Sequence, residues 1–360
     1  MANTSQQSFI IHRHGARYPL QRPKHNISWP KEKSFWDCHI GGLTPVGVLQ
    51  MNKLGYFFEQ RYNWITTNNT QIWSTHRSRA LESAWSFVLG LLPDSPVMFN
   101  CLRDEKIELK DNVCYINYYH RKYDTLFGSE DPSMIYKLNV NESTLLQKYS
   151  QDERVKKLIS RLSSEGKFRL RRDEITTTAK LKEIYSQILI DQQLQVPLEL
   201  SLVTHYGLNE EEIQLINDIG CEVMCRRLVP SNDLLTNNNF NKDQGMGLVQ
   251  DILSLLDNWS GKNELKVYSC HDTNMIAFMS ILGLKISPPG FAGYILLERT
   301  KNYNTNMDTL EVYYCQDPFG GQGQVSGKLW HMEREMYMDW DDLPDGVFAT
   351  REFVDMVKNI

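Results

Sequence analysis

The chain has 360 residues, of which 41% are hydrophobic and 23% charged, and its formal net charge is −5. A globular protein of this length and composition can bury a large core as one domain or as two. The acidic balance argues against a general nucleic-acid-binding surface, and no apolar run is long enough for a membrane span.

The first residues, Met1–Gln7, are polar and lack the apolar core of a signal peptide. We therefore expect either a cytoplasmic protein or the mature form of a secreted, periplasmic or lysosomal one. The seven cysteines are scattered without CxxC spacing, which argues against a zinc site. They leave the redox compartment and the oligomeric state open.

The first ninety residues alternate between strand and helix patterns. A buried strand is predicted at 7–13, and the loop at 20–42 is long enough to overhang a site. A Thr-Pro pair at 44–45 marks the start of a helix. A short strand at 71–73 and a helix that ends at Pro93 follow. This order is typical of the opening of an α/β sheet.

Residues 94–196 are charged and helix-prone, and no strand clearly alternates with the helices expected at 153–164 and 179–195. We interpret this segment as an inserted, mainly helical cap. The α/β catalytic domain would then comprise residues 1–93 and 197–360.

The α/β pattern resumes after the cap. A helix is expected at 243–256, a strand at 264–269, a helix at 273–282 and two further strands at 293–298 and 310–314. The predicted fold class is α/β, with a central, mostly parallel sheet flanked by helices and carrying the cap.

A basic heptad, Arg13-His14-Gly15-Ala16-Arg17-Tyr18-Pro19, closes the first predicted strand. Its histidine lies between two arginines, and nearby positive charge opposes protonation of an imidazole. The pattern favours a neutral nucleophile over a proton shuttle. Because arginine forks match phosphate geometry, a phosphoryl group is the expected target. The plainer alternative is a basic turn in which His14 only packs.

Three predicted strand-to-helix junctions carry the polar residues of interest: Arg13–Arg17, Thr75–Arg79 and His271–Asp272. Ligands of open α/β sheets bind at the carboxyl ends of the strands, so these junctions predict a phosphate pocket with one acid. Each also has a plainer reading. Asp272 could cap the next helix, and Arg77 and Arg79 could be solvated first-turn residues, which we favour for Arg77.

Three blocks of the sequence form a recognisable set: the heptad, Ser74-Thr75-His76-Arg77-Ser78-Arg79-Ala80-Leu81-Glu82-Ser83-Ala84, and Val267-Tyr268-Ser269-Cys270-His271-Asp272-Thr273-Asn274. In these blocks the sequence resembles the histidine acid phosphatases, the RHGxRxP branch of the histidine phosphatase superfamily. Looser similarity runs through 42–47 and 242–245, and the cap and tail match only in outline.

The resemblance implies an acid phosphatase that hydrolyses phosphomonoesters through a phosphohistidine intermediate. His14 would be the nucleophile. Asp272 would protonate the leaving alkoxide and then activate the hydrolytic water. Arginines would neutralise the phosphate, so neither a metal nor another cofactor is implied. The phosphate-binding residues would be Arg13, Arg17, Arg79 and His271.

Two histidines depart from the family pattern. His12 stands where an apolar strand residue is usual, and with His14 it forms a His-x-His pair that could bind a metal. No carboxylate or cysteine is obviously placed to complete such a site. His76 is similarly atypical and could lie at the pocket rim or only begin a helix.

The substrate expected is a small phosphomonoester, and the family also includes phytases, inositol polyphosphate phosphatases and lysophosphatidic acid phosphatases. In the loop after the heptad, further phosphates could meet Arg22, Lys24, His25, Lys31 and Lys33. A lipid channel could instead be lined by Trp29, Phe35 and Trp36. A solvated loop is the plainer reading of the basic residues.

Two rival functions are less well supported. A non-catalytic phosphoinositide-binding protein would need the arginines but neither His14 nor Asp272. An enzyme like phosphoglycerate mutase, from the other branch of the superfamily, typically has Glu after Arg-His-Gly, where this chain has Ala16-Arg17.

Overall fold

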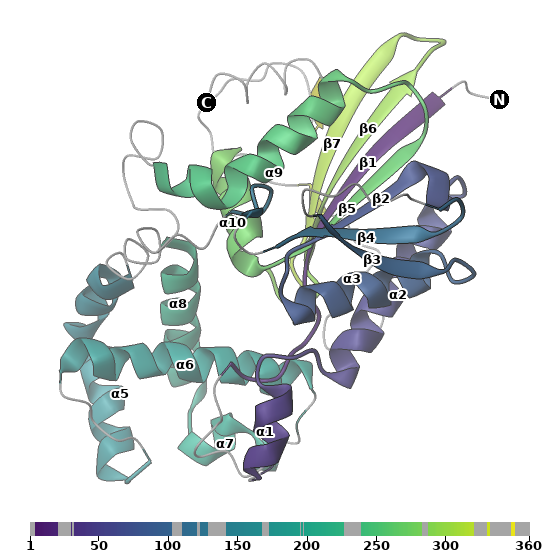
Figure 1. Ribbon diagram of the computed structural model, residues 1–360. Coiled ribbons are helices and arrows are strands. Elements are labelled where there is room, and N and C mark those ends of the chain that lie inside the picture. Colours follow the sequence, from purple (N-terminus) through teal and green to yellow (C-terminus); the bar gives the residue numbers. More distant parts are fainter. Residues whose placement is uncertain are drawn as a thin grey trace. The chain divides into compact units, whose positions relative to one another are not determined.

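The computed structural model describes residues 4–20, 30, 32–102, 110–120, 123–128, 142–167, 173–194, 196, 198–226, 239–282, 287–319, 330–331 and 347–349. The chain divides into two compact units (Figure 1). The first unit comprises Met1–Ala16, Leu43–Glu130 and Leu235–Ile360, and the second comprises Arg17–Gly42 and Asp131–Leu234.

The first unit is built on one sheet, whose described strands follow the order β3-β4-β2-β5-β1-β6-β7-β8, with β9 also paired to β7. The strands from β3 to β1 in this order are parallel, and β6, β7, β8 and β9 pair antiparallel. Their bounds are β1 Thr4–Arg13, β2 Thr70–Ser74, β3 Val97–Leu102, β4 Cys114–Tyr119, β5 Glu264–Cys270, β6 Tyr294–Asn302, β7 Met307–Cys315, β8 Trp330–His331 and β9 Val347–Ala349.

Strand β1 lies inside this sheet, between β5 and β6. Its residues 7–13 are all buried, as expected for a strand covered on both faces. The register pairs Arg13 with Cys270 on β5, and β5 in turn pairs Ser269 with Ser74 on β2. The carboxyl ends of β1, β2 and β5 therefore meet at one edge of the sheet.

Helices cover both faces of the sheet, with α2 and α3 on one side and α9 and α10 on the other (Figure 1). Their bounds are α2 Pro45–Arg61, α3 Ser78–Leu91, α9 Asn239–Asp257 and α10 Asp272–Ile281, and the short 3-10 helix η1 spans Thr67–Asn69. Helices α2 and α3 pack so closely that there is no room for a side chain at Gly55, where a Cβ would lie 1.9 Å from the carbonyl oxygen of Phe87. The expected helix start is confirmed, since Gly47 N donates to Thr44 Oγ1 at 3.1 Å.

The second unit is helical in its described residues. It contains α1 Lys33–His39, α5 Glu153–Ser164, α6 Glu174–Gln193, α7 Leu202–Tyr206, α8 Glu210–Arg226 and the 3-10 helix η3 Leu198–Leu200. Its apolar core includes Val155 and Leu162 of α5, Leu181 of α6 and Ile216 of α8.

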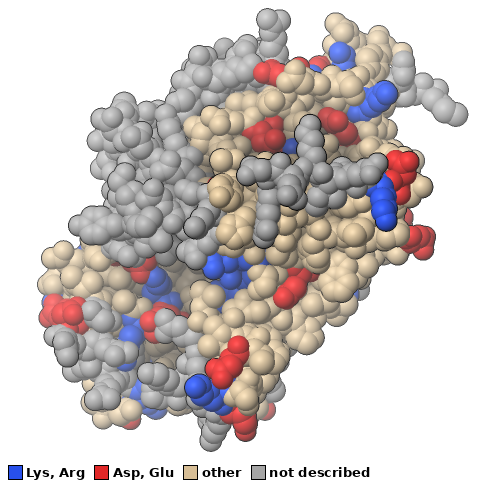
Figure 2. Space-filling model, in the orientation of Figure 1, with Lys and Arg blue, Asp and Glu red and all other residues tan. Residues whose placement is uncertain are grey.

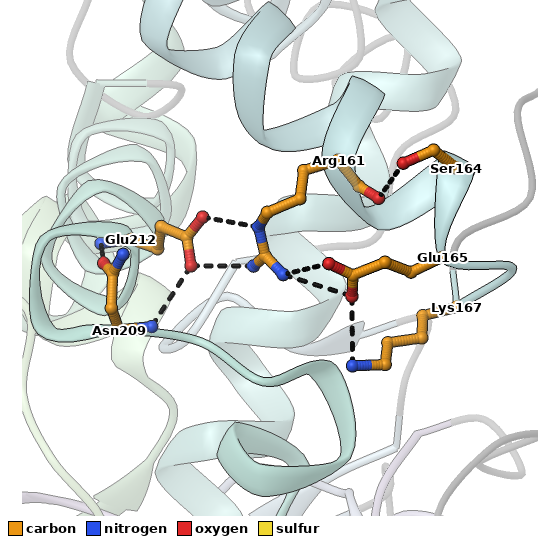
Figure 3. A network of polar contacts seen from close by, with 6 residues as sticks. All are labelled: Arg161, Ser164, Glu165, Lys167, Asn209 and Glu212. Carbon is orange, nitrogen blue, oxygen red and sulfur yellow. Dashed lines mark hydrogen bonds and ion pairs between the residues drawn. The ribbon is translucent and has the colours of Figure 1, made fainter.

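A network of partly exposed ion pairs joins α5 to α8 in the second unit (Figure 3). Arg161 donates to Glu212 through Nε at 2.9 Å and through Nη2 at 2.7 Å. The same guanidinium reaches Glu165 at 3.0 Å, and Glu165 also pairs with Lys167. Charges of both signs are interspersed on the face seen in Figure 2 as well.

The predicted α/β class is confirmed, with a sheet that is mixed because of the antiparallel strands at one side. The unit boundaries differ from the expected cap at 94–196. Strands β3 and β4 lie within that range yet belong to the sheet, and the helices of the second unit continue to Arg226. The pattern of β3 conceals it, because Met98 and Phe99 are adjacent and both about half exposed.

All seven cysteines lie within the described residues, and none of them forms a disulfide there. No described helix combines the length and the apolar character needed to cross a membrane.

Candidate active site

The three predicted junctions meet at the carboxyl edge of the sheet, where backbone hydrogen bonds join them. His14 N donates to the carbonyl of Cys270 at 3.0 Å, and Thr75 N donates to the carbonyl of Ser269 at 3.1 Å. The first residue after β1 and the first residue after β2 are therefore both hydrogen-bonded to the last residues of β5. This geometry brings the ends of β1, β2 and β5 together as expected from the sequence.

His14 is buried, with 2% of its surface exposed. Its Nδ1 lies 2.9 Å from the carbonyl oxygen of Gly15. Because a carbonyl oxygen only accepts, Nδ1 carries the proton and the lone pair of the neutral ring is on Nε2. The ring meets that of His271 edge-on at 5.4 Å. A neutral imidazole of fixed tautomer is what a histidine nucleophile requires.

The turn after His14 is fixed by helices α2 and α3. Gly15 N donates to Ser83 Oγ at 3.1 Å, and Ala16 N donates to Gln50 Oε1 at 2.9 Å. A Cβ on Gly15 would lie 2.4 Å from the carbonyl oxygen of Gly47, so the backbones approach too closely for any side chain at Gly15. These contacts set the direction of the His14 ring.

Arg13 is almost completely buried. Its Nη1 donates to the carbonyl of Pro289 at 2.7 Å, and its Nη2 pairs with Asp272 Oδ2 at 2.8 Å. The guanidinium carbon lies 4.3 Å from the centre of the Phe291 ring. Its buried Nε finds no acceptor among the described residues. Arg13 therefore retains a donor that a ligand could use.

Arg79 lies in the first turn of α3, where the helix dipole also favours an anion. Burial lowers the pKa of Arg79 to about 10; nearby Asp272 opposes this shift, and Arg77 and Arg13 add to it. Arg79 thus stays protonated at neutral pH. Its buried Nε has no acceptor within the described part of the chain. The result is a second guanidinium with an unused, desolvated donor.

His271 is the residue before the first turn of α10, and Asp272 begins that helix. The Nε2 of His271 lies 3.1 Å from Thr75 Oγ1. Burial, reinforced by Arg79, lowers the pKa of His271 to about 3, so this ring is neutral. Asp272 Oδ1 accepts from Thr273 N at 2.8 Å. The carboxylate thus supports the helix start and also pairs with Arg13.

The structure brings together five of the six predicted site residues within the first unit: Arg13, His14, Arg79, His271 and Asp272. Arg17 belongs to the second unit, where it is buried and donates through Nη1 to the carbonyl of Tyr18 at 3.0 Å.

His12 is fully buried and stacks on Phe87 of α3 at 5.3 Å between ring centres. Burial lowers the pKa of His12 to about 4. His76 is partly buried between β2 and α3. Among the residues that the structure describes, no three metal-ligating side chains come together.

Several residues that shape the site were not predicted as part of it. Thr75, Ser83 and Asn274 stand inside the matching sequence blocks, so their positions were visible although their contacts were not. Pro289 and Phe291 contact Arg13 although they lie at least 276 positions away in the sequence, and no local pattern marks them.

Part of the loop that could contact the substrate, and for which a solvated loop is the plainer interpretation, lies outside the described residues, including Arg22, Lys24, His25, Trp29 and Lys31. Lys33, Phe35 and Trp36 fall in α1. Trp36 is buried and donates to the carbonyl of Pro30, and Phe35 stacks on His39 at 4.2 Å. Internal packing therefore already occupies these two aromatic rings.

A family model described as the histidine phosphatase superfamily (branch 2) matches residues 6–309. The testicular acid phosphatase of Mus musculus is 31% identical over 91 residues, which are 24% of this chain and 21% of that protein. The aligned stretch thus spans about a fifth of that relative's length.

Solved structures with the same fold include phytases. The Hafnia alvei phytase in its apo form aligns with a TM-score of 0.64 at 16% identity, covering 100% of this chain and 97% of that one. Its complex with myo-inositol hexakis sulphate gives 0.64 at 16% identity, with 100% and 98% covered. The Citrobacter braakii phytase gives 0.62 at 15% identity, with 98% and 97% covered. At these identities the likeness establishes the fold.

Proposed function

The chain belongs to branch 2 of the histidine phosphatase superfamily, and we propose that it is a phosphoric monoester hydrolase that works through a phosphohistidine on His14. One observation carries this proposal. The Nδ1 of His14 faces a carbonyl oxygen, which leaves Nε2 as the free nitrogen of the neutral ring, and the arginines Arg13 and Arg79 each have a buried Nε donor without an acceptor in the described chain. Such donors suit a phosphate dianion.

In the first step the Nε2 lone pair of His14 attacks phosphorus, and the P–O bond of the ester breaks. The electron pair of that bond goes to the leaving oxygen, which takes a proton from Asp272. In the second step Asp272 accepts a proton from water, the water oxygen attacks phosphorus, and the P–N bond breaks. Inorganic phosphate leaves, and both His14 and Asp272 regain their starting forms.

The arginines hold the phosphoryl group in line and stabilise its charge during transfer. In the structure Arg13 pairs with Asp272, and a bound dianion would compete with that carboxylate for the guanidinium. Competition of this kind leaves Asp272 able to take up the proton that the first step consumes. Neutral His271 would add a donor, and we place Arg17 in the phosphate-binding set on the resemblance of the heptad.

No metal or other cofactor has a part in this proposal, because the arginines perform the neutralisation that a cation would supply. Asp272 must be protonated for the first step and ionised for the second. The optimum should therefore lie on the acidic side of neutrality.

Among substrates, a phosphomonoester of broad type is our first choice, and an inositol polyphosphate is the second. The second is favoured by the phytase structures that share the fold, one of which holds myo-inositol hexakis sulphate. A lysophosphatidate is less well supported, because Phe35 and Trp36 already pack internally.

The test is phosphate release from p-nitrophenyl phosphate at acidic pH, followed by phytate, lysophosphatidate and sugar phosphates. His14→Ala supplies the background, and its turnover should fall by at least about a thousandfold while its circular dichroism is unchanged. Wild-type release no greater than that of His14→Ala would refute catalysis. Phosphoinositide binding without turnover would then favour the non-catalytic alternative.

A further inference from the structure

Asn274, the third residue of α10, lies two positions after the proposed acid and is 2% exposed. We propose that Asn274 is a positioning residue, whose side chain holds the His271–Asp272 turn against the segment 123–128, where Phe127 is buried. This inference rests on the proposed function, because the turn carries the acid of that reaction.

The side-chain amide of Asn274 makes one hydrogen bond to the turn and one to the segment 123–128. Its Oδ1 accepts from His271 N at 3.2 Å, and its Nδ2 donates to the carbonyl of Phe127 at 2.9 Å. The amide therefore bridges two segments that lie 147 positions apart in the sequence.

Phe127 is itself held firmly, which makes it a suitable anchor. Its N donates to Asp124 Oδ1 at 2.9 Å, and its ring meets that of Tyr268 on β5 edge-on at 6.4 Å. Helix α9 presses on the same segment, because a Cβ on Gly247 would lie 2.0 Å from the carbonyl oxygen of Thr125. The anchor is thus fixed to β5, which also leads into His271.

The bond to His271 N is one half of a capping box at the start of α10, and it also restrains the orientation of the turn before the helix. His271 precedes the helix in an extended conformation, with φ −119° and ψ 164°. Its N–H takes no part in the helical ladder, and water could satisfy it if Asn274 were lost. The bond restrains the dihedrals that set where the His271 and Asp272 side chains point. Small misplacements of a reacting group cost large factors in rate.

The first unit contains a control with the same local bond at the other end of the sheet, but without a bridge to a distant segment. Asn69, just before β2, accepts from Thr66 N at 2.8 Å, also three residues earlier, and donates to the carbonyl of Trp64 at 2.8 Å. Asn69 precedes its strand, whereas the site residues follow theirs. A purely structural role for such asparagines should therefore give similar results at both positions.

The experiment compares Asn274→Ala and Asn69→Ala with wild type on p-nitrophenyl phosphate and on a simple alkyl phosphate. Rates are normalised to folded protein by circular dichroism. For Asn274→Ala we expect kcat on the alkyl ester to fall about ten- to a hundredfold, with a smaller loss on the activated phenol, because only the poor leaving group needs a well-placed acid. KM should change little for either ester. Asn69→Ala should keep the wild-type ratio of the two rates.

Asn274→Asp provides a second variant in case Asn274→Ala folds poorly. It keeps the acceptor for His271 N but loses the donor to Phe127, so the ratio should shift in the same direction. A wild-type ratio in both Asn274 variants would overturn the positioning role. Absence of turnover in wild type would refute the proposed function instead, so the two failures are distinguishable.

Discussion

Two groups of arginines in this protein differ in how fully their donors are used. In the second unit, Arg161 is about one-third exposed and all its nitrogens face the carboxylates of Glu212 and Glu165 (Figure 3). In the first unit, Arg13 is 4% exposed at its side chain and shares one carboxylate, that of Asp272. The Nε donors of Arg13 and Arg79 are buried without an acceptor in the described residues.

This is the difference expected between an arginine that links two helices and one that would bind a ligand in the proposed reaction. An exposed ion pair contributes only about 0–1 kcal/mol to stability. A buried donor without a partner costs about 1–3 kcal/mol, which a fold tolerates where function requires it. The site of the first unit therefore carries an electrostatic cost that a bound phosphate would offset.

Replacement of a site arginine should have the largest effect. Arg79→Met keeps the length of the side chain but removes the guanidinium that would stabilise the phosphoryl group. We expect kcat/KM on p-nitrophenyl phosphate to fall about a thousandfold. The matched Arg161→Met should keep at least half of the wild-type value. Equal losses in the two variants would remove the functional distinction between the two arginine groups.

The acid should come next. In Asp272→Asn an amide that cannot donate a proton to the leaving group replaces the carboxyl. Hydrolysis of an alkyl phosphate should therefore slow about a hundredfold more than hydrolysis of p-nitrophenyl phosphate. The alkaline limb of the pH profile should flatten on the alkyl substrate, because the first step no longer depends on a group that loses its proton as the pH rises. If both substrates lost activity equally, Asp272 would be an electrostatic partner of Arg13 only.

The sequence predicted the junctions of this site because it encodes them locally. A buried run that ends in Arg13-His14 and a strand that ends at His271-Asp272 are visible without any long-range information. The contacts of Arg13 with Pro289 and Phe291 depend on how the sheet closes, so no local pattern reports them. Strand β3 was missed for a related reason, since it ends the strand order of the described sheet and lacks a buried alternating face.

His12 of the first unit should make the stability of the protein depend on pH. Its pKa in the folded protein is about 4, below the ordinary value of 6.5, because it is fully buried against Phe87. Between pH 6.5 and 4 the unfolded chain binds a proton that the folded chain excludes. The stability contributed by neutral His12 is therefore present above pH 6.5 and declines towards pH 4, by about 3 kcal/mol at most.

His12→Leu should remove that dependence. Urea unfolding at several pH values between 4 and 7 should show the variant gaining stability relative to wild type as the pH falls. His271 acts in the same direction, since its pKa is about 3 in the fold, so some acid sensitivity should remain. Parallel curves for wild type and His12→Leu would show that His12 is protonated without cost.

The smallest effect should come from replacing Arg161, whose nitrogens all face carboxylates. Arg161→Met removes bonds to Glu212 and Glu165, yet these groups are partly exposed and can be hydrated again. We expect a loss of about 1 kcal/mol or less in the free energy of unfolding at low salt, and a smaller loss at 1 M salt, because salt screens exposed pairs. Salt should not rescue Arg79→Met, whose missing donor would face a desolvated ligand. A large, salt-independent loss of stability in Arg161→Met would mean that the ion pairs of Arg161 are as strongly desolvated as the site. The contrast between the two groups of arginines would then no longer distinguish functional arginines in this protein.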